Sequence, residues 1–427
     1  MALRIPFCYN VNMKIAIFSD CYLDLTGGIV SAINAQKSAL EKRGHTVYVF
    51  STGYKKSDAE LKKLASQNIF MVPSCKIFFR GLTPVSRRPA IIEKWLLKTH
   101  PEIKDFDIYY IHYESGCSIA GLRLGKKLHI PTVQVMHGRE DMGEEKLIPF
   151  GLRTFVAMML NWFHSWYLPH PVKVHRDDYL ANTIAKAKMW TMMINHANYA
   201  DLVLTPSEHF RKKLIHYGVK KPIIALHHGV KEELLDLNIQ PRELLPGETM
   251  KIIWHSRVSG EKRIMPFLKA LDILQQKYRQ TNYEVSIYGD GPDLKRARRY
   301  ARRHHLKTKF YGNTKFDKVW PQILKSHLDV LVSYNYDTFG MTLIEAAAAG
   351  VPTLIVDPDM KEILPPESYV LATGPTSSRI AQALNELLSH PEKINNMSNT
   401  LISCRNNFRI SHQIQKLEQV FNDIIKS

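Results

Sequence analysis

The first fifty residues alternate between an apolar run, a helical pattern and a second apolar run. Residues 14–20 (KIAIFSD) have the continuous apolar character of a strand that is buried on both faces. A glycine pair, Gly27 and Gly28, follows, and apolar residues then recur at helical spacing over about 29–43. TVYVF, residues 46–50, is the next strand. This order predicts a βαβ unit with parallel strands and a right-handed crossover.

The same alternation continues through the chain with one interruption. Residues 228–249 are polar, contain two prolines and show no sustained strand pattern, so we predict a linker there. Further strands are predicted before it at 107–112, 131–135, 202–205 and 222–226, and after it at 250–256, 283–289, 328–334 and 352–357. Helices are predicted at about 263–279, 293–305 and 342–349, and throughout 378–427. The pattern predicts an α/β fold with two Rossmann-like domains that face each other across a cleft.

Length and charge add a domain count and a class of partner. A single core rarely grows beyond about 300 residues, so a chain of 427 residues predicts two domains. The formal net charge of +18 indicates a nucleic acid, a phospholipid surface or a phosphorylated ligand, and it does not choose among them. The five cysteines are scattered and lack CxxC spacing, which is typical of free thiols in a reducing compartment.

Hydropathy and the start of the chain bear on location. Residues 1–12 are short and contain a single charge, so we do not interpret them as a signal peptide, and Met13 is an alternative start. No segment reaches the roughly 18–20 apolar residues that span a bilayer. The nearest, 154–168, is interrupted by Asn161 and His164. Any membrane contact is therefore expected to be peripheral.

The strongest local pattern is DTFGMTLIEAAAAGVP, residues 337–352, which follows a buried strand and opens a helix. Gly340 lets the backbone approach a ligand without a Cβ atom. The amides of Met341 and Thr342 stand at the predicted helix N-terminus, which suits a phosphate. Two carboxylates, Asp337 and Glu345, bracket the turn and suit the hydroxyls of a sugar and a ribose. The alternative is that Asp337 caps the helix and Glu345 is a solvated helix residue.

Three further features also follow strands. Arg257 and Lys262 share a strand-to-helix loop and can neutralise a diphosphate, with solvated loop charges as the alternative. Gly27-Gly28 lacks both the GxGxxG and the GK[ST] pattern, so a simple tight turn is its alternative. His137 follows the strand at 131–135, where open α/β sheets bind ligands, and its alternative is a loop histidine. Because every feature follows a strand, all are expected at the same edge of their sheets.

With these residues the chain resembles the retaining, GT-B-fold glycosyltransferases of family 4, from Met13 to the last helix. The most specific element is the family's E-x7-E pattern, here Asp337-x7-Glu345, with Asp in place of the usual first Glu. The resemblance implies that Glu345 binds the ribose and that Asp337 binds the transferred sugar. It implies that Arg257 and Lys262 hold the diphosphate.

The resemblance extends to the rest of the chain. It implies an acceptor-binding domain at 1–235, a nucleotide-sugar-binding domain at 236–404, and a last helix, 405–427, that packs back on the first domain. It implies that Gly27 and Gly28 form the glycine loop near phosphate and acceptor, and that His137 lies beside the donor sugar. Tyr288-Gly289-Asp290-Gly291-Pro292 is similar to the family's G-x-GP turn, interpreted as mainly structural. His137-x-x-Glu140-Asp141 resembles the HTxYEDY segment of bacterial diacylglycerol glucosyltransferases, with Gly138 and Arg139 replacing Thr and Tyr.

The family's mechanism is a same-face displacement in which the departing diphosphate gains negative charge. Arg257, Lys262 and the helix dipole at 340–342 would stabilise that charge. The resemblance therefore implies a nucleotide-sugar donor, with a UDP-sugar favoured, and no dedicated nucleophile, metal or further cofactor. The sequence also lacks clustered His and Cys ligands.

Two segments bear on the acceptor. Residues 147–168 are rich in apolar and aromatic side chains, and basic residues follow, which predicts either a membrane-docking element or a core or interdomain helix. The helix at 293–305 carries six cations and is either a contact for anionic lipid or a solvated charged face.

These observations favour a cytoplasmic enzyme, peripheral at the inner face of the cell membrane. It would transfer a hexose from a UDP-sugar to a lipid or cell-envelope acceptor. The alternatives are a soluble glycosyltransferase with a saccharide or protein acceptor, a sugar-nucleotide epimerase, and a nucleic-acid-binding protein. The chain has no RRM, KH or zinc-finger pattern, so we expect no nucleic-acid partner.

Overall fold

The computed structural model describes residues 12–21, 28–53, 56–77, 83–139, 141 and 150–427. It divides into two compact units. The first consists of Met1–Pro206, Phe210–Leu226 and Ile414–Ser427, and the second of Ser207–His209 and His227–Gln413. Gly27, Glu140 and the beginning of the apolar segment 147–168 lie outside the described residues.

The first unit is built on a seven-stranded parallel sheet in the order β3-β2-β1-β6-β7-β8-β9. Its strands are β1 (Lys14–Ser19), β2 (Thr46–Ser51), β3 (Ile69–Met71), β6 (Ile108–His112), β7 (Thr132–Val135), β8 (Leu202–Thr205) and β9 (Ile223–Ala225). The strand order reverses at β1 and β6. Ligands in open α/β sheets bind beyond the carboxyl ends of the strands at such a point.

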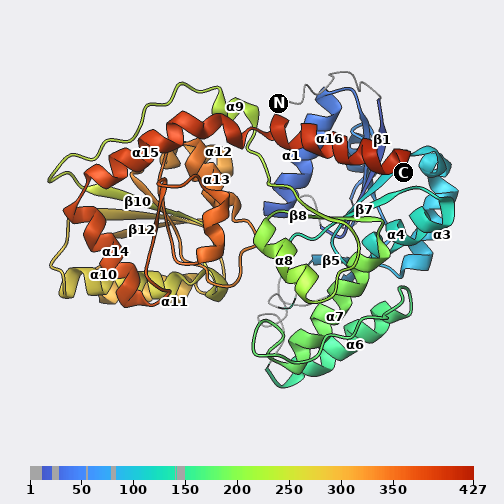
Figure 1. Cartoon of the computed structure of the whole chain (residues 1–427), viewed down its shortest axis with the longest axis horizontal. Helices are drawn as coiled ribbons and strands as arrows, with labels where there is room; N and C mark the ends of the chain where they lie inside the picture. Colours follow the sequence, from blue (N-terminus) through green and yellow to red (C-terminus); the bar gives the residue numbers. More distant parts are fainter. Residues whose placement is uncertain (1–11, 22–27, 54–55, 78–82, 140, 142–149) are drawn as a thin grey trace, which may run out of the picture. The chain divides into compact units, whose positions relative to one another are not determined.

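Helices cover both faces of this sheet. The crossovers from β1 to β2 and from β6 to β7 run in opposite directions, so right-handed connections put α1 and α4 on opposite faces (Figure 1). A short antiparallel hairpin of β4 (Ser74–Ile77) and β5 (Thr83–Ser86) stands outside the main sheet. The helices of the unit are α1 (Gly28–Lys42), α2 (Asp58–Ala65), α3 (Pro89–Thr99), α4 (Gly116–Leu128), α6 (Arg153–Ser165), α7 (Ile184–Tyr199) and α8 (Glu208–His216).

The second unit repeats this design with a six-stranded parallel sheet in the order β12-β11-β10-β13-β14-β15. The strands are β10 (Met250–His255), β11 (Tyr283–Tyr288), β12 (Thr308–Gly312), β13 (Leu328–Leu331), β14 (Thr353–Ile355) and β15 (Tyr369–Leu371). The order reverses at β10 and β13, which creates a second switch point. The helices are α9 (Glu232–Leu235), α10 (Ile264–Gln276), α11 (Leu294–Arg303), α12 (Phe316–Ile323), α13 (Met341–Ala348), α14 (Ser377–Ser389) and α15 (Glu392–Cys404), and the last helix, α16 (Ile410–Lys426), begins in this unit and continues into the first.

The predicted linker contains one helical turn and is tied to the second unit. Residues 232–235 form α9, which the polar composition of 228–249 concealed. The Arg405 guanidinium donates to the backbone oxygens of Leu234, Leu237 and Ala348. Arg409 donates to the carboxylate of Glu232 at 2.5 Å. These bonds give the segment a defined path without a strand or a long helix.

The C-terminal helix α16 contributes its later turns to the first unit. Glu418 accepts hydrogen bonds from Arg43 Nε and Nη2 at 2.5 and 2.8 Å, and its Oε1 lies 2.8 Å from His45 Nε2. The ring of Phe421 packs edge-on against Tyr110 of β6 at 5.2 Å between centroids. The last residues of the chain therefore stabilise the sheet that begins with the first strand.

Candidate functional site

The loop after β10 carries Arg257 and is shaped by a glycine turn after β11. Gly289 and Gly291 have φ values of +135° and +157°. A Cβ atom on Gly289 would lie 2.1 Å from Ser256 O, and one on Gly291 would lie 2.4 Å from Val258 O. Only glycine permits this approach, so the turn holds the backbone on both sides of Arg257. The Arg257 side chain itself is 63% exposed, and its Nη1 lies 3.6 Å from Glu261 Oε1.

Lys262 and Asp337 meet directly, although 75 residues separate them in sequence. Lys262 ends the short 3-10 helix η3 (Gly260–Lys262), and its Nζ donates to Asp337 Oδ1 at 2.6 Å. The ammonium group also lies 5.4 Å from the centroid of the Tyr336 ring. Ser333 Oγ donates to the other oxygen of Asp337. The structure thus brings together Lys262, which the sequence predicts to hold the diphosphate of the donor, and Asp337, which it predicts to bind the transferred sugar.

Helix α13 starts beside this pair because Gly340 turns the backbone. Gly340 has a φ of +72° and forms the N-cap of the helix, followed by Met341 and Thr342 in the first turn. A Cβ atom there would lie 3.1 Å from Leu331 Cδ2. The unpaired amides of the first turn carry the positive end of the helix dipole, an arrangement that suits an anion. Glu345 lies one turn further along α13, with its side chain 19% exposed.

The sequence analysis missed His255, the last residue of β10. Its Nε2 lies 3.4 Å from Glu345 Oε2, and its Nδ1 lies 3.1 Å from Asp329 Oδ1 of β13. The imidazole is 4% exposed and Asp329 is 1% exposed. Burial alone lowers the pKa of His255, but the two carboxylates outweigh it and raise the pKa to about 10. His255 is therefore an imidazolium at neutral pH.

His137 lies at the carboxyl end of β7 in the first unit and contacts a second histidine. His137 Nε2 lies 2.7 Å from Nδ1 of His112, the buried last residue of β6, and the two rings stack at 4.9 Å. Two residues further along, the Arg139 guanidinium donates to both oxygens of Asp141, at 3.1 and 2.6 Å. Gly28 begins α1 beyond β1, so it stands at the same edge of the sheet. This edge contains the switch point of the first unit.

Buried histidines also connect α6 and α7 with β7. His164 of α6 lies 2.6 Å from His170 and 3.1 Å from His196 of α7. His196 Nε2 lies 3.0 Å from Gln134 Oε1 of β7. Burial lowers the pKa values of all three histidines, that of His196 to about 3. The rings are therefore neutral at physiological pH and hold two helices to the sheet by hydrogen bonds.

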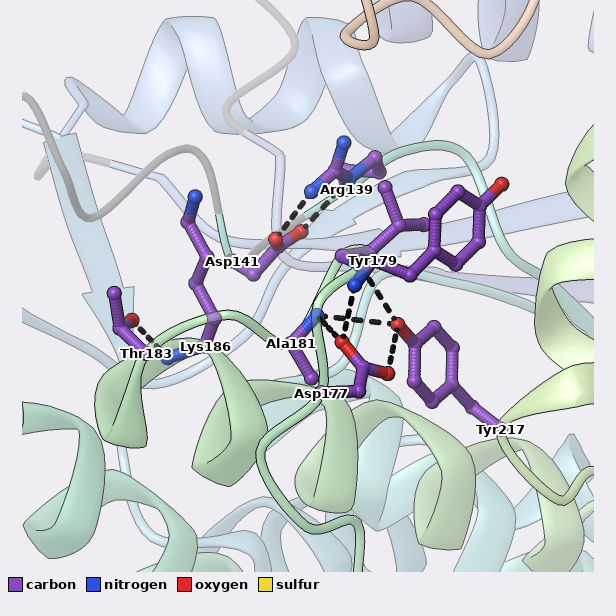
Figure 2. A network of polar contacts seen from close by, with 9 residues as sticks. Arg139, Asp141, Asp177, Tyr179, Ala181, Thr183, Lys186 and Tyr217 are labelled. Atoms are coloured by element: carbon purple, nitrogen blue, oxygen red, sulfur yellow. Dashed lines mark hydrogen bonds and ion pairs between the residues drawn. The ribbon is translucent and has the colours of Figure 1, made fainter.

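The loop that joins α6 to α7 is fixed by a carboxylate network (Figure 2). Asp177 Oδ1 accepts from the backbone amides of Tyr179 and Ala181 at 3.0 and 2.9 Å, and the Tyr217 hydroxyl donates to Oδ2 at 2.8 Å. The Thr183 hydroxyl accepts from the Lys186 amide and caps α7. These bonds tie the loop together, and α6 packs along α7.

The site residues predicted from sequence thus fall into two sets. Lys262, Asp337, Gly340, Met341, Thr342 and Glu345 gather at the switch point of the second unit, with Arg257 on the adjacent loop. Gly28 and His137 belong to the first unit. Within the described ranges, no helix is both long enough and apolar enough to cross a bilayer.

Comparison with known proteins identifies the family. Residues 26–234 match the family model Glycosyltransferase Family 4, and residues 237–401 match Glycosyl transferases group 1. The chain is 22% identical to the alpha-monoglucosyldiacylglycerol synthase of Streptococcus pneumoniae, over 80% of this chain and 70% of that protein. It is also 22% identical to the synthase of the same name from Acholeplasma laidlawii, over 80% of each chain.

Solved structures share the fold. Anabaena HepE in complex with UDP superposes with a TM-score of 0.67 at 14% identity, covering 96% of this chain and all of HepE. TarM superposes with a TM-score of 0.69 at 12% identity, covering 96% of this chain and 99% of TarM. These similarities confirm the predicted GT-B architecture, which consists of two Rossmann-like halves. The family models favour a transferase over the two alternatives of an epimerase and a nucleic-acid-binding protein. The chain therefore belongs to the glycosyltransferases of family 4, enzymes that transfer a sugar from a nucleotide-sugar donor.

Proposed function

We propose that this enzyme transfers a hexose from a UDP-sugar to a lipid acceptor at the surface of an anionic membrane, with retention of anomeric configuration. The observation that carries the donor half is the gathering of Lys262, Asp337 and Glu345 at the β10–β13 switch point. The lipid acceptor is supported by the two relatives named alpha-monoglucosyldiacylglycerol synthase. The UDP donor is supported by the HepE structure in complex with UDP.

In the donor complex, Arg257 and Lys262 neutralise the diphosphate and the α13 N-terminus binds one of its phosphates. Asp337 then holds hydroxyls of the sugar, and Glu345 holds those of the ribose. Without donor, Asp337 accepts a hydrogen bond from Lys262, which keeps both charges paired in a partly buried site. A diphosphate offers Lys262 a stronger anionic partner, so donor binding exchanges one ion pair for another and frees Asp337 for the sugar.

The transfer exchanges one bond for another on the same face of the sugar. The bond between the anomeric carbon and the β-phosphate oxygen breaks, and a bond from the acceptor oxygen to that carbon forms. The acceptor proton passes to the departing phosphate oxygen. Negative charge grows on the diphosphate as it leaves, where Arg257, Lys262 and the α13 dipole stabilise it. His137, oriented by His112, is proposed to contact a hydroxyl of the donor sugar.

The membrane half of the proposal rests on the outer face of α6. Phe155, Trp162 and Trp166 are 66%, 57% and 53% exposed, and Met158 and Met159 are about half exposed. Their spacing puts them along one side of the helix, while Ala157 and His164 are buried on the side that faces α7 (Figure 1). Trp, Phe and Met side chains on a helix surface are typical of an element that lies in the interface of a bilayer.

Basic residues favour an anionic bilayer. Lys173 and Arg176 are exposed in the loop that follows α6. In the second unit, all six cations of α11 are exposed, whereas Ala297 and Ala301 face the core. Each cation near an anionic surface contributes about 1 kcal/mol of attraction. The apolar face of α6 inserts into the bilayer, and the cations attract the enzyme to the anionic surface over a longer distance.

Vesicle sedimentation tests the membrane half. The enzyme is expected to pellet with vesicles that contain phosphatidylglycerol and to stay in solution with pure phosphatidylcholine. Replacing Phe155, Trp162 and Trp166 by serine should reduce binding at least tenfold, because roughly 2 kcal/mol is lost for each large apolar side chain that inserts fully. Ile91→Ser, which changes an exposed apolar residue of α3, is the matched control and should leave binding unchanged. Undiminished binding by the triple variant contradicts docking through α6.

Calorimetric titration tests the donor half. Titrations of UDP-, GDP- and ADP-glucose should give measurable binding for the uridine compound and at least tenfold weaker binding for the others. The binding is expected to weaken in Arg257→Ala, which removes an exposed cation without opening the core. Equal affinity for all three nucleotides, or an Arg257→Ala variant that binds like the wild type, opposes the proposal.

A further inference from the structure

We propose that His255 is a positioning residue of the donor site, which fixes the carboxylate of Glu345 and thereby sets the enzyme's recognition of the ribose. This inference rests on the proposed function, because it takes Glu345 as the residue that binds the ribose hydroxyls. His255 itself touches no part of the donor in this account. It acts through the orientation of Glu345.

A series of polar contacts crosses four elements of the second unit. Thr353 of β14 donates from its hydroxyl to Asp329 Oδ2 of β13 at 3.2 Å. Asp329 Oδ1 lies 3.1 Å from His255 Nδ1 at the end of β10. His255 Nε2 lies 3.4 Å from Glu345 Oε2 on α13. This series of contacts thus runs from the interior of the sheet to its carboxyl edge and ends on one oxygen of Glu345.

Burial makes this arrangement specific. Asp329 and His255 are almost completely buried, and a buried carboxylate needs a charged or hydrogen-bonded partner. The imidazolium supplies that partner and has a second N–H on the opposite side of a rigid ring. The ion pair with Asp329 places the ring, and the second nitrogen of the ring attracts the partly exposed carboxylate of Glu345.

The consequence for binding follows from the two oxygens of Glu345. Because His255 contacts Oε2, the carboxylate is restricted to orientations that present Oε1 to a ligand. A site whose groups are held before binding loses less side-chain entropy when the ligand arrives. Without His255, Glu345 would sample several rotamers, and its hydrogen bonds to the ribose would weaken.

A double-mutant cycle on nucleotide binding tests this inference. We would measure UDP and 2′-deoxy-UDP binding calorimetrically for the wild type, His255→Leu, Glu345→Gln and the combined variant. His255→Leu is expected to weaken UDP binding about tenfold, or about 1.4 kcal/mol, and to reduce the preference for UDP over the deoxy compound. In the Glu345→Gln background the same change should have little further effect, because the two residues act as one unit. In the transfer reaction, KM for the donor should rise while kcat changes less.

Two further variants separate positioning from loss of structure. His255→Leu leaves Asp329 buried without its cation, so His255→Leu combined with Asp329→Asn removes the charge as well and should show the same loss of ribose preference. His304→Leu breaks another histidine–aspartate pair of the same unit, between His304 after α11 and Asp272 of α10 at 2.9 Å, and should leave the preference intact. Thermal unfolding curves establish that each variant is folded.

The outcomes distinguish this inference from the proposed function. If Glu345→Gln leaves UDP binding unchanged, the assignment of the ribose site is wrong. If Glu345→Gln weakens binding but both His255 variants keep the wild-type preference for UDP over 2′-deoxy-UDP, the donor site stands and the inference about His255 is overturned. Additive losses in the combined variant also overturn it, because they mean that His255 acts independently of Glu345.

Discussion

At the scale of single residues, the proposed donor site combines positions that a sequence motif contains with one that it does not. Asp337 and Glu345 stand eight residues apart across a glycine turn, and that spacing is what singles them out in the sequence. His255 belongs to no short motif. Its partners, Asp329 and Glu345, are 74 and 90 residues further along the chain. They lie close to His255 because β10 pairs with β13 and α13 follows β13. Contacts that depend on strand pairing cannot be derived from local spacing.

Lys262 provides the first prediction at this scale. Lys262→Ala removes the cation proposed to bind the diphosphate and leaves Asp337 without its partner. UDP affinity should fall by about 10–100-fold, as expected for the loss of a charge-assisted hydrogen bond of about 1.5–3 kcal/mol. Lys269→Ala is the control, since Lys269 is exposed on α10 in the same unit. Calorimetric titration of UDP measures both, and equal affinities would remove Lys262 from the site.

The glycine turn after β11 provides the second prediction. Gly289→Ala would push a methyl group against Ser256 O, next to Arg257, so the loop must move. Gly247 also has a positive φ, +84°, but a Cβ atom there meets open space. Gly247→Ala should therefore show only backbone strain of about 1–2 kcal/mol. Gly289→Ala should cost more and should weaken UDP binding as well. Urea unfolding measures stability, and equal costs for the two variants would mean that close packing at Gly289 is unimportant.

At the scale of elements, α6 was predicted by its apolar and aromatic residues, but its orientation was not. The same residues were compatible with a core helix, because a single sequence does not reveal which side of an element is covered. The exposed Phe155 and Trp162 now favour the docking interpretation, which remains a proposal. The contacts among the histidines on the opposite side were not predicted. They meet only when α6, α7 and β7 are packed together.

These histidines predict a dependence of stability on pH. The folded state keeps His164, His170 and His196 neutral, whereas histidines in the unfolded chain take up protons below about pH 6.5. The unfolded state therefore binds more protons, and the free energy of unfolding falls as the pH drops from 6.5 toward the folded pKa of His196, about 3. Each fully neutral buried histidine contributes a slope of roughly 1 kcal/mol per pH unit.

Urea unfolding at several pH values between 7 and 4.5 measures this slope. His196→Gln keeps an amide that can donate to Gln134 and should flatten the profile, while His390→Gln, at a half-exposed histidine of the second unit, should not. A His196→Gln profile as steep as that of the wild type contradicts the proposed cause.

The basic helix α11 gives a prediction of its own. Changing Arg298 and Arg302, both exposed, to glutamine should weaken binding to phosphatidylglycerol vesicles by about 30-fold, at about 1 kcal/mol for each cation. The difference from the wild type should shrink as salt is added, because exposed charges are screened. The control is Lys269→Gln combined with Lys416→Gln, which lowers the net charge equally at exposed positions on other helices. Equal losses in both double variants would mean that total charge, and not α11, determines binding.

At the scale of the whole molecule, the sequence predicted two α/β halves, and the structure confirms them. Ten strands of the two sheets were recognised from their continuous apolar runs, the pattern that burial on both faces of a parallel sheet produces. The strands β3, β12 and β15 of the two sheets and the hairpin strands β4 and β5 were missed. Strands β3 and β15 are short and only half-buried, and β12 alternates between half-buried and exposed residues. The three strands missed from the two main sheets lie at sheet edges, away from both switch points, so the predicted order of elements around those points did not depend on them.

The central claim is that sugar leaves a UDP donor at the site formed by Lys262, Asp337 and Glu345. The most direct test is the initial rate of sugar transfer from radiolabelled UDP-glucose to diacylglycerol in phosphatidylglycerol vesicles. The wild type should form labelled glycolipid, and at donor concentrations below KM, Asp337→Ala and Glu345→Ala should each lower the rate by about 10–100-fold, because each loses charge-assisted hydrogen bonds to the donor of about 1.5–3 kcal/mol. Transfer at the wild-type rate by both variants would contradict the account.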